Sequence, residues 1–250
     1  MAKGGPKIFL LGYPDNRTTQ FIFSAFIQNE VPITGMIIQR MDFISIIKRF
    51  WSKCSREGLM AALRRASENL FIRRKQIAEL TLLGGCQVFY VEKHNSLETR
   101  DILEKEHCSL LLLASAPILR PVIVDIPNLL ILNAHPGWLP KYRGLDANLK
   151  AIRDGHLPAV SVHRVTTRID AGDVYLRETF IIDTAVSLLE QLEQRELEVS
   201  ARLLIEAAKR FHEGRLTPIT IGETLGKYEP KLPLAAKRKI VRQFKMEVKS

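Results

Sequence analysis

The chain has 250 residues, of which 46% are hydrophobic and 26% charged, and its formal net charge is +10. This balance excludes a disordered chain, a collagen and a disulfide scaffold. The three cysteines, Cys54, Cys86 and Cys108, show no C-x-x-C spacing, so neither a disulfide framework nor a zinc ribbon is expected. Because no signal sequence and no run of 18 apolar residues is found, we expect no transmembrane helix and a cytoplasmic location.

The first half of the chain alternates short apolar runs with helical patterns. Strands are predicted at 7–11, 31–38, 86–90 and 110–114, and helices from about 16 to 28 and over 97–106. The run LLLLA at 110–114 is apolar at every position, which is typical of a parallel strand covered on both faces. Pro32 and Gly35 argue against a regular strand over the whole of 31–38.

Two segments carry the positive charge. Residues 40–75 hold ten Lys or Arg against three acidic residues, a net of +7, and residues 226–250 hold eight against two, a net of +6. Apolar residues recur at helical spacing within about 40–80, which predicts a basic helical insertion. Such segments suit an anionic partner, for example RNA, a phosphorylated substrate or a membrane surface. A helix that packs on its own domain and a frayed, solvated tail remain the alternatives.

The second half continues the pattern. Strands are predicted at 129–133 and around 161–165, a long helix at 187–210, and a short β element followed by a basic helical tail after Gly214. Strands that alternate with helices predict an α/β fold with a doubly wound, mostly parallel sheet. We expect a main domain over 1–212, which includes the helical insertion at about 40–80, and a short C-terminal extension with a basic tail over 213–250.

One stretch, LLILNAHPGWLPKYRG at 129–144, carries polar groups suited to chemistry. Asn133 and His135 are two residues apart at the end of an apolar strand, so both side chains lie on one face. At the C-terminal edge of a parallel sheet, that face lines the crevice where ligands bind. An Asn amide can donate to a developing oxyanion, and a protonated imidazole can do the same or deliver a proton. A purely structural role for the histidine is the alternative.

A second stretch, SVHRVTTRIDAGDV at 161–174, supplies a carboxylate. Ser161 and His163 share one face of a predicted strand, and Asp170 follows in a loop. A carboxylate near His135 would hold the imidazole as its cation and fix its orientation, so we expect His135 to act in its protonated form. An Asx-turn for Asp170 and a core hydrogen bond for His163 are the alternatives.

Together these motifs resemble one family. The patterns N-x-H-P at 133–136, L-P-x-Y-R-G at 139–144, S-V-H at 161–163 and I-D-x-G at 169–172 are similar to those of the 10-formyltetrahydrofolate-dependent formyltransferases. This family includes glycinamide ribonucleotide, methionyl-tRNA and amino-sugar N-formyltransferases. The resemblance covers roughly residues 7–212 and is densest over 108–185. It implies a Rossmann-like catalytic domain that transfers a formyl group to an amine, with 10-formyltetrahydrofolate as co-substrate and no metal.

The resemblance also implies roles for individual residues. Asn133 and His135 would hold the oxyanion, while Asp170 would support His135 and assist proton transfer. The implied folate pocket consists of Pro117, Ile118, Leu119, Thr166, Thr167, Arg168, Ile169 and Ala171. The implied acceptor site consists of Tyr142, Arg143, Gly144 and His163. Because proline has no N–H, the backbone at Pro117 can contribute only an acceptor.

The amine acceptor follows by elimination. The loop at 12–19 lacks the run of glycines that binds phosphate in the glycinamide ribonucleotide formyltransferases. The residues after 214 are too few for the C-terminal domain of the methionyl-tRNA formyltransferases. We therefore expect a small anionic amine, a nucleotide-linked amino sugar. A compact methionyl-tRNA formyltransferase and a non-catalytic relative that binds RNA or another anion through the basic segments remain open, as does a homodimer.

Overall fold

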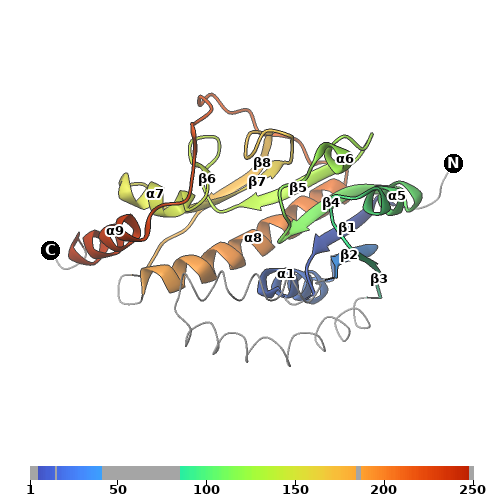
Figure 1. Ribbon diagram of the computed structural model, residues 1–250, viewed down its shortest axis with the longest axis horizontal. Helices are drawn as coiled ribbons and strands as arrows, with labels where there is room; N and C mark the ends of the chain where they lie inside the picture. The colour runs from blue at the N-terminus through green and yellow to red at the C-terminus, as the bar shows by residue number, and fades with distance from the viewer. Residues whose placement is uncertain (1–4, 15, 41–84, 184–186, 248–250) are drawn as a thin grey trace. The chain divides into compact units, whose positions relative to one another are not determined.

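The computed structural model describes residues 5–14, 16–40, 85–183 and 187–247 (Figure 1). The chain divides into two compact units, Met1–Leu129 and Leu130–Ser250. The helical insertion predicted at about 40–80 falls, apart from its first residue, outside the described residues. The predicted boundary between residues 212 and 213 lies at the end of a long helix, and the division into a main domain and an extension stays a prediction.

The first unit is built on parallel strands. These are β1 (Lys7–Gly12), β2 (Gly35–Gln39), β3 (Gln87–Val91) and β4 (Cys108–Ala114). They lie in the order β3-β2-β1-β4, and each of their three pairings is parallel. The helices described in this unit are α1 (Arg17–Gln28), α5 (Leu97–Lys105) and α6 (Pro121–Val124).

The sequence explains where these elements lie. β1 and β4 are buried along nearly their whole length because their apolar runs have no polar interruption. α1 begins after Asn16, whose Oδ1 accepts hydrogen bonds from the N–H groups of Thr18 and Thr19. β2 is shorter than predicted and begins at Gly35, since Pro32 lacks the N–H that a strand interior needs.

The second unit is built on antiparallel strands. Its sheet contains β5 (Leu130–His135), β7 (Ala159–Arg164) and β8 (Val174–Thr179) in that order, and both pairings are antiparallel. The long helix α8 (Leu188–His212) packs against all three strands. The two-residue strand β6 (Arg143–Gly144) pairs in parallel with β9 (Tyr228–Glu229). The helices α7 (Ala147–Arg153) and α9 (Leu234–Glu247) complete the described unit.

The α/β class is confirmed, and the parallel arrangement is seen in the first unit. The antiparallel order β5-β7-β8 departs from a uniformly parallel sheet, so β5 meets β7 in opposite directions. The short β element and the helical tail predicted after Gly214 are confirmed as β9 and α9. Within the described ranges, no helix is both long enough and apolar enough to cross a membrane.

Candidate active site

The pairing of β5 with β7 gathers four polar side chains. The register places Asn133 opposite His163 and His135 opposite Ser161. Cross-strand partners point to the same side of a sheet, and so do residues two apart on one strand, so all four share one face. Asn133 Nδ2 donates to His163 Nε2 over 3.4 Å. The predicted common face of Asn133 and His135 is confirmed, and β7 adds His163 to it.

The loop after β7 brings a carboxylate to the same place. Asp170 Oδ2 lies 3.6 Å from His135 Nδ1, and Asp170 Oδ1 lies 3.7 Å from His163 Nε2. The backbone of Asp170 is left-handed, with φ of 50°. Gly172 shapes the same loop, because a Cβ there would collide with the carbonyl of Arg164. One carboxylate, which is 13% exposed, therefore lies between two imidazoles.

Two residues of β6 hold this carboxylate in place. The Gly144 N–H donates to Asp170 Oδ2 over 2.9 Å. Arg143 Nε donates to the Asp170 carbonyl over 3.0 Å, and its Nη2 donates to the Ile169 carbonyl over 2.5 Å. Arg143 is only 8% exposed. Arg143 and Gly144 therefore position the Asp170 loop in this structure, and their implied contact with the acceptor stays a prediction.

Hydrogen bonds to backbone carbonyls fix the tautomers of both histidines. His135 Nε2 donates to the Tyr142 carbonyl over 2.9 Å, and His163 Nδ1 donates to the Arg164 carbonyl over 2.9 Å. A neutral imidazole carries one N–H, so the lone pairs lie on His135 Nδ1 and His163 Nε2. Both of these nitrogens face Asp170.

Burial keeps the two imidazoles neutral near pH 7. It lowers the pKa of His135 below its ordinary value, and the opposing attraction of Asp170 is the smaller effect. It also lowers the pKa of His163 to about 4, assisted by repulsion from a charged His135. The expectation that Asp170 holds His135 as a cation is therefore wrong. His135 is only 5% exposed, and the loss of hydration lowers its pKa more than the charge of Asp170 raises it.

Ser161 was placed on this strand face by the sequence, but its contacts were not predicted. Its hydroxyl donates to the Gly137 carbonyl over 2.7 Å and accepts from the Leu139 N–H over 3.0 Å. These two bonds fix the turn that follows His135. The signal was present in the sequence, because Ser161 shares a strand face with His163. Tyr142, which was predicted for the acceptor site, supplies its carbonyl to His135. Its hydroxyl donates to Asp154 over 3.2 Å.

The residues implied for the folate pocket fall into both units. In the Asp170 loop, Thr166 Oγ1 donates to the Arg168 carbonyl over 2.9 Å. The remaining members of this loop set are Thr167, which is exposed, and Ile169 and Ala171, which are half-buried. Pro117, Ile118 and Leu119 belong to the first unit and follow β4. The binding roles of all these residues stay predictions.

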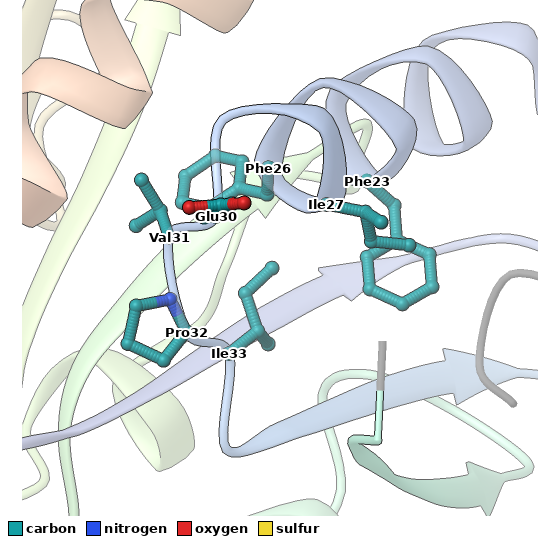
Figure 2. A pocket seen from close by; sticks show the side chains of 7 residues that line it. All are labelled: Phe23, Phe26, Ile27, Glu30, Val31, Pro32 and Ile33. Carbon is teal, nitrogen blue, oxygen red and sulfur yellow. The ribbon is translucent and has the colours of Figure 1, made fainter. Parts of the chain in front are cut away.

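The first unit also contains a cavity of about 230 Å³ at the end of α1 (Figure 2). Its lining consists of Phe23, Phe26, Ile27, Glu30, Val31, Pro32 and Ile33. The lining is apolar except for Glu30, and it includes no residue implied for catalysis or binding. Over the described ranges, no group of three or more His, Cys, Asp or Glu side chains is arranged to hold a metal ion.

Known proteins are similar to this chain in sequence and in fold. The family model for formyl transferases matches residues 75–208. Methionyl-tRNA formyltransferase from Thermotoga neapolitana is 29% identical over 148 residues, which is 58% of this chain and 47% of that protein. The chain thus spans about half the length of the curated relatives it matches.

Two solved structures show the same fold. Glycinamide ribonucleotide transformylase 1 from Symbiobacterium toebii has a TM-score of 0.59 at 21% identity, over 91% of this chain and 96% of that one. A sugar N-formyltransferase from a Shewanella species has a TM-score of 0.57 at 16% identity, over 95% of this chain and 87% of that one. At these identities, the matches establish a shared α/β fold alone. Because the family model covers more than half of the sequence, the chain belongs to the formyl transferase family.

Proposed function

We propose that this protein transfers the formyl group of 10-formyltetrahydrofolate to a primary amine. The observation that carries the proposal is the placement of Asp170 Oδ2 3.6 Å from His135 Nδ1, on a strand face that also holds Asn133. An amide donor beside an imidazole and a carboxylate meets two needs of acyl transfer: stabilising an oxyanion and moving a proton. Membership of the formyl transferase family supports the same reaction.

In this proposal the folate supplies the formyl group, and Asn133 stabilises negative charge. The Asn133 amide has two N–H donors, and one of them is used by His163. The other donates to the formyl oxygen, which becomes negative when the amine adds to the formyl carbon. His163 thereby orients the amide rather than reacting itself.

His135 and Asp170 move the proton. The lone pair on His135 Nδ1 accepts the proton that the attacking amine must lose, and Asp170 stabilises the resulting imidazolium. The same Nδ1 then returns the proton to the folate nitrogen as its bond to the formyl carbon breaks. Once it is protonated, His135 also stabilises the oxyanion. This sequence uses the neutral ring that burial favours.

For the acceptor, we propose a nucleotide-linked amino sugar. The loop at 12–19 has no glycine-rich run, which disfavours glycinamide ribonucleotide, and a sugar N-formyltransferase has the same fold; together these support the choice. Methionyl-tRNA is the second candidate. It is favoured by relatives such as the Thermotoga neapolitana protein and by the positive charge of residues 226–250. We place the reaction in the cytoplasm, which the free thiols of Cys86 and Cys108 support.

An acceptor panel tests this proposal. Consumption of 10-formyltetrahydrofolate is measured with nucleotide-linked 3-amino and 4-amino sugars, glycinamide ribonucleotide, charged initiator tRNA, and water alone. We expect turnover with an amino sugar. Turnover with tRNA alone would replace the sugar by the second candidate, and consumption with water alone would identify a hydrolase. If no amine accepts a formyl group and the folate does not bind, the proposed reaction is wrong.

A further inference from the structure

The segment 226–232 lies against the strand that holds Asp170. β9 pairs in parallel with β6, so that Tyr228 lies opposite Arg143 and Glu229 lies opposite Gly144. Figure 1 shows this orange-red part of the chain beside β6, before it enters α9. Arg143 and Gly144 are the residues that hold the Asp170 loop, so the segment 226–232 contacts the strand that positions the Asp170 carboxylate.

A single buried guanidinium connects the segment to the loop. The Gly226 carbonyl accepts from Arg143 Nη1 over 2.9 Å, and the Gly226 N–H donates to the Pro140 carbonyl over 2.9 Å. Two further donors of Arg143, on Nε and Nη2, go to the carbonyls of Asp170 and Ile169. A guanidinium fork that binds three carbonyls has little freedom to rotate, so a shift of Gly226 is transmitted to the loop.

The rest of the segment is anchored independently. Lys150 Nζ donates to the carbonyls of Glu229 over 3.2 Å and Pro230 over 2.9 Å. Asp146 Oδ2 accepts from the Leu232 N–H over 2.9 Å. The segment is therefore held at Gly226 by Arg143 of β6, and farther along by Lys150 of α7 and by Asp146 at the start of that helix.

We propose that residues 226–232 are a positioning element of the active site, which sets the location of the Asp170 carboxylate through Arg143 and Gly144. Arg143 fixes the backbone of Asp170, and the Gly144 N–H fixes its Oδ2 atom. The effect on turnover rests on the proposed function, whereas the effect on the geometry of Asp170 does not.

Close backbone approach gives the proposal a sharp test. A Cβ at Gly226 would collide with the carbonyl of Lys141, whereas a Cβ at Gly222 has no atom within 4 Å. Gly226→Ala and Gly222→Ala therefore add the same methyl group to the same stretch of chain, and only the first forces the backbone to move. Neither glycine has a left-handed φ, so no conformational penalty confuses the comparison.

The first readout is turnover by the full-length protein. We expect Gly226→Ala to lower kcat by roughly ten- to a hundred-fold, the effect of misplacing a reacting group by about 1 Å. Gly222→Ala should stay within about twofold of the wild type. Thermal unfolding of each variant shows whether it is folded at the assay temperature.

The second readout is independent of turnover: the His135 ring is titrated by ¹⁵N NMR of histidine-labelled protein. Asp170 raises the pKa of His135 against the effect of burial, while Arg143 and Lys150 act in the opposite direction. Both glycine variants leave these charges in the chain. If Gly226→Ala moves the carboxylate away, the midpoint of His135 falls below the wild-type midpoint, whereas Gly222→Ala leaves it unchanged.

The outcomes separate the two proposals. A lower His135 midpoint in Gly226→Ala supports the positioning element even if the wild type transfers no formyl group, which would contradict only the proposed function. An unchanged midpoint in a folded Gly226→Ala variant overturns the positioning element, whether or not turnover falls. If Gly226→Ala does not fold, Arg143→Lys takes its place under the same criteria, because lysine keeps the charge but lacks the planar fork whose Nε, Nη1 and Nη2 atoms reach the three carbonyls.

Discussion

His135 and Asp170 show how burial decides the chemistry that a histidine can perform. The ring donates through Nε2 to a backbone carbonyl and turns its lone pair on Nδ1 toward the carboxylate. Desolvation keeps the ring neutral near pH 7, so it is prepared to accept a proton rather than to donate one. The motif N-x-H at 133–135 predicted His135, and the separate stretch at 161–174 predicted Asp170. Neither could predict this protonation state, which depends on burial.

The activity should therefore fall on the acid side. The rate of formyl transfer is expected to stay level above about pH 6.5, the ordinary pKa of histidine, and to fall below it as His135 becomes protonated. Asp170→Asn removes the charge that raises the pKa of His135, so its acid limb should move to lower pH. The measurement is kcat between pH 5 and 8 for both proteins. A wild-type rate that declines as the pH rises through this range would contradict the account.

Stability should also depend on His163. Its pKa is lowered to about 4, mainly by burial. Between pH 6.5 and 4 the unfolded state therefore binds a proton that the folded state does not, and stability falls as the pH falls. The loss is on the order of 3 kcal/mol for a buried ring of this kind, measured by urea unfolding at pH 7.5 and 4.5. His163→Gln should lose part of this dependence, and the exposed control His156→Gln should keep it; equal slopes would count against the buried neutral ring.

At the scale of elements, apolar runs predicted the strands that carry the site. β1, β4 and β5 follow directly from such runs, and the last of them ends at His135. β6 and β9 have two residues each, which is too short for any periodic signal. Their pairing depends on backbone contacts between distant segments, so the support that Arg143 and Gly144 give to Asp170 could not be predicted.

Lys150 illustrates the same limit. A lysine in α7 would be expected at the surface, yet Lys150 is 1% exposed and donates to the carbonyls of Leu145, Glu229 and Pro230. The Glu229 carboxylate also contributes, with its Oε2 atom 3.6 Å from Lys150 Nζ. These acceptors satisfy the three donors of the ammonium, so the alternative of a frayed C-terminal tail does not apply to this segment.

Replacing this lysine should destabilise the second unit. Lys150→Met leaves three carbonyls without their donor, and we expect a loss of about 3 kcal/mol in the free energy of unfolding. The control is Lys239→Met at an exposed position of α9, which should change stability by less than about 0.5 kcal/mol. Urea denaturation measures both. Equal stabilities of the two variants would mean that Lys150 does not anchor residues 229–230.

For the whole molecule, the motifs over 133–172 predicted the family, and the match over residues 75–208 confirms it. The acceptor could not be predicted in the same way. It depends on the surfaces around the site, and the strongest basic segment, at 40–75, falls almost wholly outside the described residues. The chain also spans about half the length of the methionyl-tRNA formyltransferases that it matches, so their substrate does not by itself identify the acceptor of this chain.

The central claim is that Asn133 stabilises the oxyanion of a formyl transfer. The most direct test follows label from formyl-¹³C 10-formyltetrahydrofolate to the amine, by mass spectrometry, in the wild type and in Asn133→Ala. We predict labelled product from the wild type and a rate lower by about 10² to 10³ in the variant, with the melting temperature unchanged, because one oxyanion donor is lost. A folded variant that transfers the label at nearly the wild-type rate would contradict the account.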